Sequence, residues 1–225
     1  MPTDSENPVG GSTTGSLSVP AALKSANEVH GTLAGALTTH NATFGSLLST
    51  ACLDDLCDLA RTAPPGAFVE VGVYRGGSAI RLYEIAEQQN RTLYLFDTFA
   101  GHSIVDPEHD DPGIHHVGRF DDGPTVSVLR IRMPRAIFGV GSFPLTLGAT
   151  GPIAFVHSDA DLYWPTHAVC ELLVPRMVSG GMLLFDDYGY DKIGCPGVRE
   201  VVDAMFGPPA PEDIRPGSQR LVRIP

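Results

Sequence analysis

Two apolar runs that each end in a pair of aspartates constrain the fold of this chain more than any other feature. Residues 153–157 lead into Asp159 and Asp161, and residues 182–185 lead directly into Asp186 and Asp187. Strands that are apolar at every position are typical of parallel sheets, which are covered on both faces. In open α/β sheets the ligand crevice lies beyond the carboxyl ends of the strands. If the two strands are neighbours, four carboxylates meet there.

Four carboxylates at one edge of a sheet would repel one another unless a cation lies among them. Oxygen ligands of this kind suit Mg²⁺, Mn²⁺ or Ca²⁺. The pattern therefore predicts a divalent metal site. For any single aspartate the alternative is ordinary turn chemistry or a helix cap, but two pairs on successive strands favour the metal site.

The stretch from residue 67 to residue 97 has the pattern of a βαβ unit with a glycine-rich turn. A strand at 67–73 runs into a turn at 74–78, a helix follows at 79–89, and a second strand at 93–97 ends in Asp97. Glycines let the backbone approach a ligand closely, and the start of the helix offers free N–H groups. Asp97 follows Gly76 by about 20 residues, where an acid takes ribose hydroxyls. The unit predicts a nucleotide-like ligand.

Glu70 favours one class of cofactor over another. It places a carboxylate where a pyrophosphate-binding turn would want none, and a carboxylate there suits a ligand that carries an ammonium group. Together with Asp97 it favours S-adenosylmethionine over NAD. The alternatives are a hydrogen bond to the turn for Glu70 and a helix cap for Asp97. The predicted cofactor-binding residues are Glu70, Gly72, Tyr74, Gly76, Ser78, Asp97, Thr98, Phe99, Gly141 and Asp159.

The rest of the chain predicts one α/β domain with additions. Residues 1–20, rich in Ser, Thr, Gly and Pro, predict a disordered tail; residues 21–63 predict a helical extension, and residues 64–225 the main domain. Further elements are expected as strands at 136–140, 153–157 and 182–185, helices at 165–177 and 196–206, and two short strands near Ile214 and at 221–224. The His- and Asp-rich segment 98–135, with a helix near 125–133, predicts a solvated lid over a substrate site; its histidines follow no known metal-ligand spacing.

Composition excludes several classes of function. A net charge of −11 argues against a nucleic-acid-binding surface. No apolar run approaches the length of a membrane span, and no signal-peptide pattern is visible. The four cysteines lack C-x-x-C spacing, which predicts reduced core residues of a cytoplasmic protein; zinc ligation or nucleophilic catalysis is the alternative.

Four motifs, in order, resemble those of the macrocin O-methyltransferase family, which contains metal-dependent sugar O-methyltransferases of macrolide and aminocoumarin antibiotic pathways. They are VEVGVYRGGS at 69–78, LFDTFAG at 95–101, HSDADLY at 157–163 and FDDYG at 185–189, followed by CPGVR at 195–199. The resemblance covers residues 67–206.

The resemblance implies a Rossmann-like class I methyltransferase fold: a seven-stranded, mostly parallel sheet flanked by helices, with the last strand antiparallel. It implies S-adenosylmethionine as the methyl donor and Mg²⁺ bound by Asp159, Asp186 and Asp187. Asp161 then falls to the general base, with support of the metal ligands as its alternative. The implied acceptor is a small hydroxylated molecule, a glycoside of a natural product or glycan. We also expect a homo-oligomer formed through the N-terminal helices.

Three alternative functions remain open at this point. A catechol-like O-methyltransferase would act on a vicinal phenol with metal ligands at the same strand ends. A non-catalytic S-adenosylmethionine-binding domain would have little reason to concentrate four acids. A NAD-dependent oxidoreductase is disfavoured by Glu70 and by the absence of a Tyr/Lys or Cys/His pair at a strand end.

Overall fold

The computed structural model describes residues 45–190 and 195–225 of the chain. The predicted tail and most of the predicted helical extension, residues 1–44, lie outside the described residues. Within them, six strands form one sheet in the order β3-β2-β1-β4-β5-β6. All neighbouring strands are parallel except β5 and β6, which are antiparallel. The strands are β1 (Ala67–Val71), β2 (Leu93–Asp97), β3 (Ile137–Val140), β4 (Ile153–Ser158), β5 (Met177–Phe185) and β6 (Arg220–Arg223).

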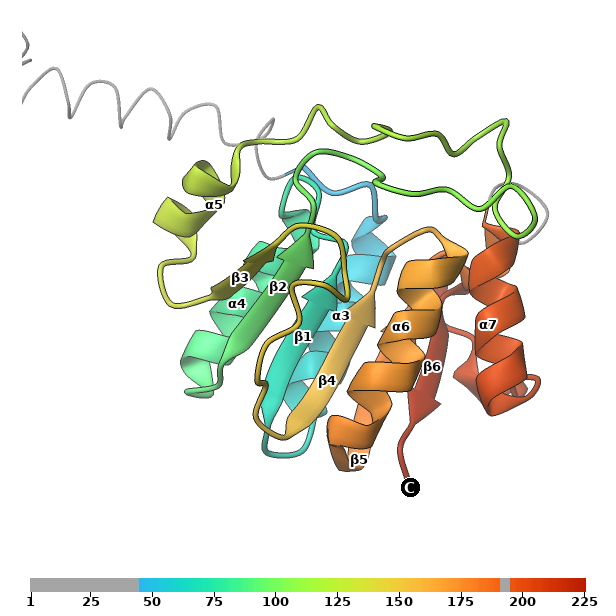
Figure 1. The fold of residues 1–225 in the computed structure, drawn as a ribbon. Helices are drawn as coiled ribbons and strands as arrows, with labels where there is room; N and C mark the ends of the chain where they lie inside the picture. The colour runs from blue at the N-terminus through green and yellow to red at the C-terminus, as the bar shows by residue number, and fades with distance from the viewer. Residues whose placement is uncertain (1–44, 191–194) are drawn as a thin grey trace, which may run out of the picture. The chain divides into compact units, whose positions relative to one another are not determined.

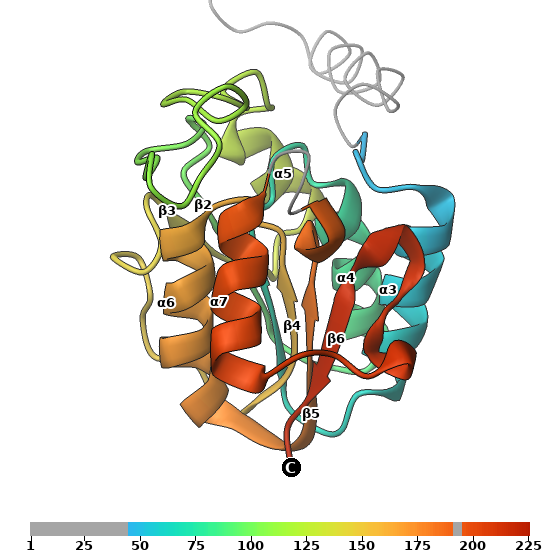
Figure 2. The same cartoon turned by 90° about the vertical axis from the view of Figure 1, so that its right-hand side faces the viewer.

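Helices cover both faces of this sheet (Figures 1 and 2). On one face lie α3 (Thr50–Thr62) and α4 (Gly77–Gln88), and on the other lie α6 (Tyr163–Leu173) and α7 (Pro196–Phe206). A short helix, α5 (Val126–Arg132), lies near β3. The Rossmann-like α/β fold with a mostly parallel sheet is therefore as predicted. No helix in the described part of the chain is long and apolar enough to cross a membrane.

The central strands are buried on both faces, as their sequences predict. Every residue of β1 and β4 is buried, and so are the last five residues of β5. One core cluster packs against α3 and α4, where Phe68 and Phe155 meet edge to face with ring centroids 5.9 Å apart. A second cluster packs against α6 and α7. Each large apolar side chain buried in this way contributes about 1.5–3 kcal/mol, which holds the strand ends in fixed positions.

The described sheet has six strands, one fewer than the resemblance implies. The two short strands expected at the C-terminus are reduced to one, because Ile214 forms only an isolated bridge with Arg220. The residues before β6 form 3₁₀ turns at Pro211–Asp213 and Pro216–Ser218 instead. Each turn has a proline near its start, and proline lacks the N–H that a paired strand needs.

The boundary between α6 and β5 also differs from the prediction. The helix ends at Leu173, a 3₁₀ turn follows at Val174–Arg176, and β5 begins at Met177 rather than at residue 182. The Gly-Gly sequence that predicts a turn is a bulge inside the strand: Ile153 pairs with Met177, but Phe155 pairs with Met182. Gly180 has φ +76°, and its N–H donates to the carbonyl of Ile224, 2.8 Å away. A glycine allows the strand to continue through this irregularity.

Most residues of the segment 98–135 are exposed or half-buried. It doubles back on itself, because the N–H of His102 donates to the carbonyl of Arg119 and the N–H of Gly118 donates to the carbonyl of His102, each at 2.9 Å. Asp110 and His115 are buried, with 4% and 3% of their surface exposed. The Asp110 carboxylate accepts hydrogen bonds from the backbone N–H groups of Asp106 and Tyr163. We call residues 98–125, which precede α5, the lid segment.

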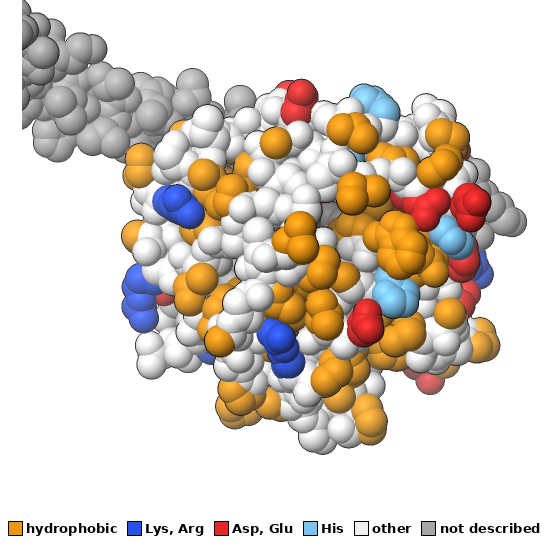
Figure 3. All heavy atoms as spheres, in the orientation of Figure 1, with side chains coloured by type: hydrophobic (Ala, Val, Ile, Leu, Met, Phe, Trp, Pro, Cys, Tyr) orange, Lys and Arg blue, Asp and Glu red, His pale blue; other side chains and the backbone are white. Residues whose placement is uncertain are grey.

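Charged side chains are unevenly distributed on the face of the molecule in Figure 3. Lys and Arg side chains on that face are few and separated, with acidic groups and histidines gathered at one side. All four cysteines are buried and free, as predicted.

Candidate active site

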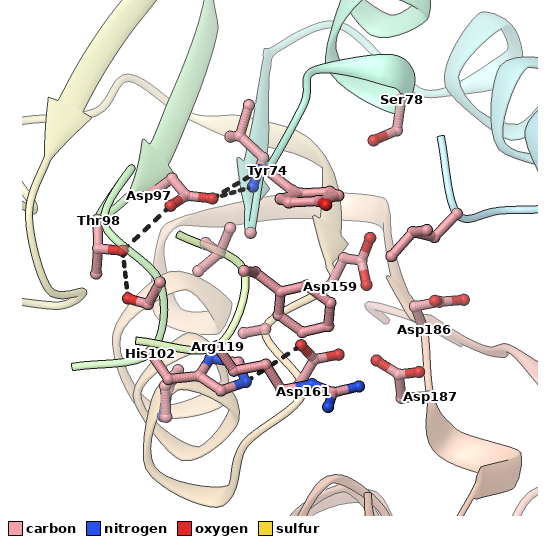
Figure 4. Close-up of a pocket in the computed structure, with 18 of the residues that line it drawn as sticks. Tyr74, Ser78, Asp97, Thr98, His102, Arg119, Asp159, Asp161, Asp186 and Asp187 are labelled. Carbon is pink, nitrogen blue, oxygen red and sulfur yellow. Dashed lines mark hydrogen bonds and ion pairs between the residues drawn. The ribbon is translucent and has the colours of Figure 1, made fainter. Parts of the chain in front are cut away.

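A cavity of about 410 Å³ opens at the carboxyl ends of β1, β2, β4 and β5. Its wall combines the glycine-rich turn after β1, the strand ends that carry the acids, and the lid segment (Figure 4). This volume lies within the range of about 300–1,000 Å³ that is usual for small-molecule sites. Its position is where open α/β sheets bind ligands.

Three carboxylates meet in the wall of this cavity. Asp159, Asp186 and Asp187 each offer an oxygen atom, and these atoms all lie within 4.8 Å of one another. Strand pairing produces this arrangement. The N–H of Asp186 donates to the carbonyl of Ser158, and the N–H of Asp159 donates to the carbonyl of Val71, so the hydrogen bonds between neighbouring strands continue to the aspartates. The neighbouring strands predicted from the sequence do bring their acids together.

Burial raises the pKa of each of these three carboxyl groups, and the neighbouring acids raise the pKa of Asp159 and Asp187 further. The pKa of Asp186 rises less than those of Asp159 and Asp187, because the charge of His157 and a hydrogen bond from Gln219 at 2.7 Å oppose the effect of burial. The Oδ2 atom of Asp187 is buried without a hydrogen-bond partner among the described residues. Desolvated acids and an unpartnered oxygen fit a hard divalent cation, which would relieve their repulsion and accept their lone pairs.

Asp161 lies beside this group but faces the lid segment. Its Oδ2 atom is 3.6 Å from Nε2 of His102, and 19% of its side chain is exposed. Asp161 and Asp187 have positive φ angles of 61° and 56°, and Tyr74 in the glycine-rich turn has φ 47°. Such angles cost energy for non-glycine residues and concentrate at functional sites. The backbone conformation thus directs two aspartates toward the cavity.

Asp97 organises the glycine-rich turn. Its Oδ2 atom accepts hydrogen bonds from the N–H groups of Val73 (2.6 Å) and Tyr74 (2.8 Å), and its Oδ1 atom accepts one from Phe99 (2.7 Å). The Thr98 hydroxyl also lies 3.4 Å from Oδ1, but it donates its one proton to the carbonyl of Gly101 at 2.6 Å. A carboxylate has about four lone-pair sites, so Asp97 retains acceptor capacity toward the cavity. These bonds hold the glycine-rich turn and Phe99, so Asp97 does not act as the helix cap that was its alternative role.

Gly72 is required by the crossing of two chain segments. A Cβ atom at this position would lie 1.7 Å from the carbonyl oxygen of Asp159, and φ is +90°. The first glycine of the turn therefore lets β1 pass beside the metal-ligand candidate. The crossing of the two segments explains this glycine without close approach of a ligand.

Most of the predicted site residues line the cavity. The lining residues among them are Gly72, Tyr74, Ser78, Asp97, Thr98, Gly141, Asp159, Asp161, Asp186 and Asp187. Gly76 and Phe99 do not line it. Gly76 is the left-handed N-cap of α4, with φ +81°, and Phe99 packs against the core.

Glu70 is the clearest departure from the sequence prediction. It is fully buried and does not line the cavity, and its Oε1 atom lies 2.9 Å from Nδ1 of His157. The parallel pairing of β1 with β4 places Glu70 directly opposite His157, so the two side chains share one face of the sheet. A buried histidine, rather than a ligand in the cavity, is thus the partner of Oε1, while Oε2 has no hydrogen-bond partner among the described residues.

The lid segment contributes cavity residues that the sequence analysis did not identify. His102, His115 and Arg119 line the cavity from the side opposite the glycine-rich turn. The histidine-rich composition was the available signal, but only the folding back of the segment brings His102 next to His115, with Nε2 and Nδ1 3.2 Å apart.

A surface contact joins the two sides of the cavity mouth. Asp122 accepts a hydrogen bond from Tyr74 Oη (2.7 Å), and Arg75 donates to its other oxygen (2.5 Å). Tyr74 and Arg75 belong to the glycine-rich turn, and Asp122 belongs to the lid segment. We call this contact the Asp122 latch.

Comparison with known proteins places these features in a family context. The family model described as Macrocin-O-methyltransferase (TylF) matches residues 50–205. A Streptomyces olivaceus protein named 8-demethyl-8-(2,3-dimethoxy-alpha-L-rhamnosyl)-tetracenomycin-C 4'-O-methyltransferase is 33% identical over 144 residues, which are 56% of this chain and 54% of that protein. Demethyldecarbamoylnovobiocin O-methyltransferase of Streptomyces niveus is 30% identical over 157 residues, 62% of this chain and 57% of that protein. The chain thus spans little more than half the length of these relatives.

Solved structures confirm the fold. The calicheamicin methyltransferase CalS11 superposes with a TM-score of 0.62 at 21% identity, covering 89% of this chain and 93% of that one. The O-methyltransferase NovP superposes with a TM-score of 0.61 at 20% identity, covering 80% and 81%. At these identities the likeness shows the architecture alone.

Proposed function

Because the chain belongs to the macrocin O-methyltransferase family, we propose that it is an O-methyltransferase that uses S-adenosylmethionine and Mg²⁺ to methylate a sugar hydroxyl of a small natural product. One observation carries this proposal: Asp159, Asp186 and Asp187 converge in a cavity that also contains the glycine-rich turn and Asp97. The Streptomyces olivaceus relative is named for a rhamnosyl derivative of tetracenomycin. A glycoside is therefore the first acceptor to test.

The glycine-rich turn and the end of β2 would hold the cofactor. Asp97 is placed to accept hydrogen bonds from ribose hydroxyls, while Gly72, Tyr74, Ser78, Thr98 and Gly141 would form the surrounding wall. S-adenosylmethionine supplies an electrophilic methyl group when bound. Asp97 also fixes the turn through its bonds to Val73 and Tyr74, so the site is organised before the ligand arrives, which lowers the cost of binding.

The three clustered aspartates would hold the metal. Mg²⁺, when bound, orients an acceptor and lowers the pKa of a hydroxyl beside it. Gln219 fixes the carboxylate of Asp186 through a 2.7 Å hydrogen bond, and the buried Glu70–His157 pair lies behind these aspartates in β1 and β4. Asp186 is thus oriented by Gln219, which does not line the cavity.

Asp161 is the residue that we assign to proton removal. It lines the cavity next to the metal-ligand candidates, and 19% of its side chain is exposed, so an acceptor hydroxyl can reach it. A carboxylate within hydrogen-bond distance of the hydroxyl serves as a general base. Support of the metal ligands is the other role open to Asp161, and kinetic comparison of its variants separates the two.

The direct test is methyl transfer by the purified full chain. The chain would be incubated with S-adenosylmethionine, with or without Mg²⁺, and with a panel of L-rhamnosides and vicinal phenols, and methylated products would be detected by mass spectrometry. We expect methylated rhamnoside only when Mg²⁺ is present. Asp186→Asn should lower turnover by about a hundredfold or more, because a metal supplies several kcal/mol of charge stabilisation.

Asp54→Asn is the matched control, since Asp54 is an exposed aspartate on α3. It should turn over as the wild type does. Methylation of the phenols but not the rhamnosides would reject the sugar assignment in favour of a catechol-like enzyme. Failure to bind S-adenosylmethionine in calorimetry would reject the cofactor.

The cytoplasmic location, the homo-oligomer and the division of the chain at residues 20 and 63 stay predictions. Light scattering of the full chain measures its mass in solution and tests the oligomer. Helix α3, within the predicted extension, packs in the main core through Leu56, Leu59 and Ala60, so we place the start of the compact domain before this helix.

A further inference from the structure

A second group of metal-ligand atoms lies beside the three aspartates, on the lid side of the cavity. Its members are His102, His115 and Asp161, and one ligand atom from each lies within 4.8 Å of those of the other two. The Nε2 atom of His102 is 3.2 Å from Nδ1 of His115 and 3.6 Å from Oδ2 of Asp161. Figure 4 shows His102 and Asp161 directed toward each other.

We propose that His102, His115 and Asp161 form a transition-metal site that binds Zn²⁺, separate from the oxygen-only site of Asp159, Asp186 and Asp187. Two imidazole nitrogens and one carboxylate oxygen are the ligands that Zn²⁺ takes in open sites, with a fourth position left for water. Mg²⁺, by contrast, prefers oxygen ligands. The two groups of side chains are therefore matched to different classes of ion.

The distances between the ligand atoms fit a zinc ion. With Zn–N bonds of about 2.0–2.1 Å and tetrahedral angles, neighbouring ligand atoms are separated by about 3.3 Å. The separations of Nε2 of His102 from Nδ1 of His115 and from Oδ2 of Asp161, 3.2 Å and 3.6 Å, lie on either side of that value. Small side-chain adjustments suffice to place the three atoms around one ion.

The three side chains are held in place by the fold. Only 10% of the His102 side chain is exposed, and His115 is buried. Backbone hydrogen bonds tie His102 to residues 118 and 119, and the N–H of His115 donates to Asp111 at 2.8 Å. The outer nitrogen of His115, Nε2, faces Sγ of Cys195 at 3.7 Å. Metal-binding histidines usually donate this second N–H to a carboxylate, a backbone carbonyl or water, and the sulfur of Cys195 is a weaker acceptor in the same position.

One positively charged side chain, Arg119, also lines the cavity near the group. The positive charge of Arg119 opposes a cation at this position, and it also lowers the pKa of His102. Arg119 is directed partly away, because one of its guanidinium nitrogens donates to the carbonyl of Ile114.

Occupation of this site has a consequence that rests on the proposed function. Asp161 cannot accept a proton from an acceptor while its carboxylate is bound to Zn²⁺. Zinc is then an inhibitor of methyl transfer, and it acts at a position that Mg²⁺ does not occupy. The test of the site itself uses binding alone, so that failure of the proposed activity does not affect it.

The experiment is titration of the metal-free full chain with Co²⁺, a spectroscopic substitute for Zn²⁺, in excess Mg²⁺. Excess Mg²⁺ keeps the oxygen-only site filled. We expect intense visible absorption bands of a four-coordinate Co²⁺ site with nitrogen ligands, which Zn²⁺ abolishes by displacement. His102→Asn should weaken Zn²⁺ binding roughly a hundredfold, because loss of a ligand costs at least as much as the loss of an outer-shell partner.

The matched control is His116→Asn, because His116 is an exposed histidine of the same segment. It should bind Co²⁺ and Zn²⁺ as the wild type does. His115→Gln is the second ligand variant, and thermal unfolding without metal checks that each variant is folded. A wild-type spectrum with only the weak bands of six-coordinate Co²⁺, or wild-type affinity in a folded His102→Asn variant, would overturn the proposal.

Discussion

Replacing Asp159 by asparagine is expected to stabilise the metal-free protein, although it removes a candidate metal ligand. The carboxylate oxygens of Asp159, Asp186 and Asp187 lie within 4.8 Å of one another. At that separation, and at an effective dielectric constant of about 20, one ionised pair costs about 3.5 kcal/mol. The protein escapes part of this cost by keeping a carboxyl group protonated, so we expect a gain of about 1–3 kcal/mol.

The dependence of this gain on pH follows from the direction of the pKa shifts. Burial and neighbouring charges raise the pKa of Asp159 and Asp187 above the ordinary value of 3.8. The folded state therefore binds more protons than the unfolded state above that pH. Stability of the metal-free wild type is present at low pH and is lost as the pH rises from the unfolded pKa through the folded pKa.

The assay is thermal unfolding in chelator and in Mg²⁺, between pH 5 and pH 8. For a domain of this size 1 kcal/mol corresponds to about 2–4 °C, so a gain of about 1–3 kcal/mol from Asp159→Asn should raise the midpoint in chelator by about 2–12 °C at pH 8. Mg²⁺ should raise the midpoint of the wild type but not that of the variant. Asp54→Asn, the exposed control, should change neither. A variant that unfolds below the wild type in chelator would refute the like-charge reasoning.

Three further predictions concern the strands around the cavity. Gly72→Ala should lower the free energy of unfolding by about 3 kcal/mol or more, because its Cβ would lie 1.7 Å from the Asp159 carbonyl oxygen; an unchanged urea midpoint would contradict the crossing. Asp97→Asn should weaken S-adenosylmethionine binding about tenfold in calorimetry and leave Mg²⁺ binding unchanged, whereas equal cofactor affinity would assign Asp97 to the turn alone. Glu70→Gln should lower the free energy of unfolding by about 2–3 kcal/mol, because it alters a fully buried contact with His157. It should leave S-adenosylmethionine affinity within about twofold. A large loss of affinity would instead support the predicted contact between Glu70 and the ammonium group of the cofactor.

Local signals located the elements that begin or end at distinctive residues. The strand at 93–97 and the helix at 196–206 have the predicted bounds. Asp97 ends an apolar run in the first case, and Pro196 begins a helix in the second, where a missing N–H costs nothing. The early start of β5 had no such signal. Its bulge at Gly180 depends on pairing with β4 and with Ile224, which lie far away in the sequence.

The site residues also divide into those with a local sequence signal and those that depend on distant parts of the chain. The acids that follow β4 and β5 were found because strand ends are recognisable and parallel neighbours share an edge. The pairing of Glu70 with His157 was missed because it depends on the register between β1 and β4. The His102–His115 contact was missed because its residues meet only after the lid segment folds back on itself.

The Asp122 latch makes the two halves of the cavity thermodynamically dependent on each other. A cofactor that shifts Tyr74 or Arg75 changes their contact with Asp122, and an acceptor that shifts the lid segment changes the same contact from the other side. By linkage, each ligand must then change the affinity for the other by the same factor. Because Asp122 is exposed, with 62% of its side chain accessible, solvent weakens an ion pair of this kind. The reciprocal effect is therefore small, and it should decrease as salt is added.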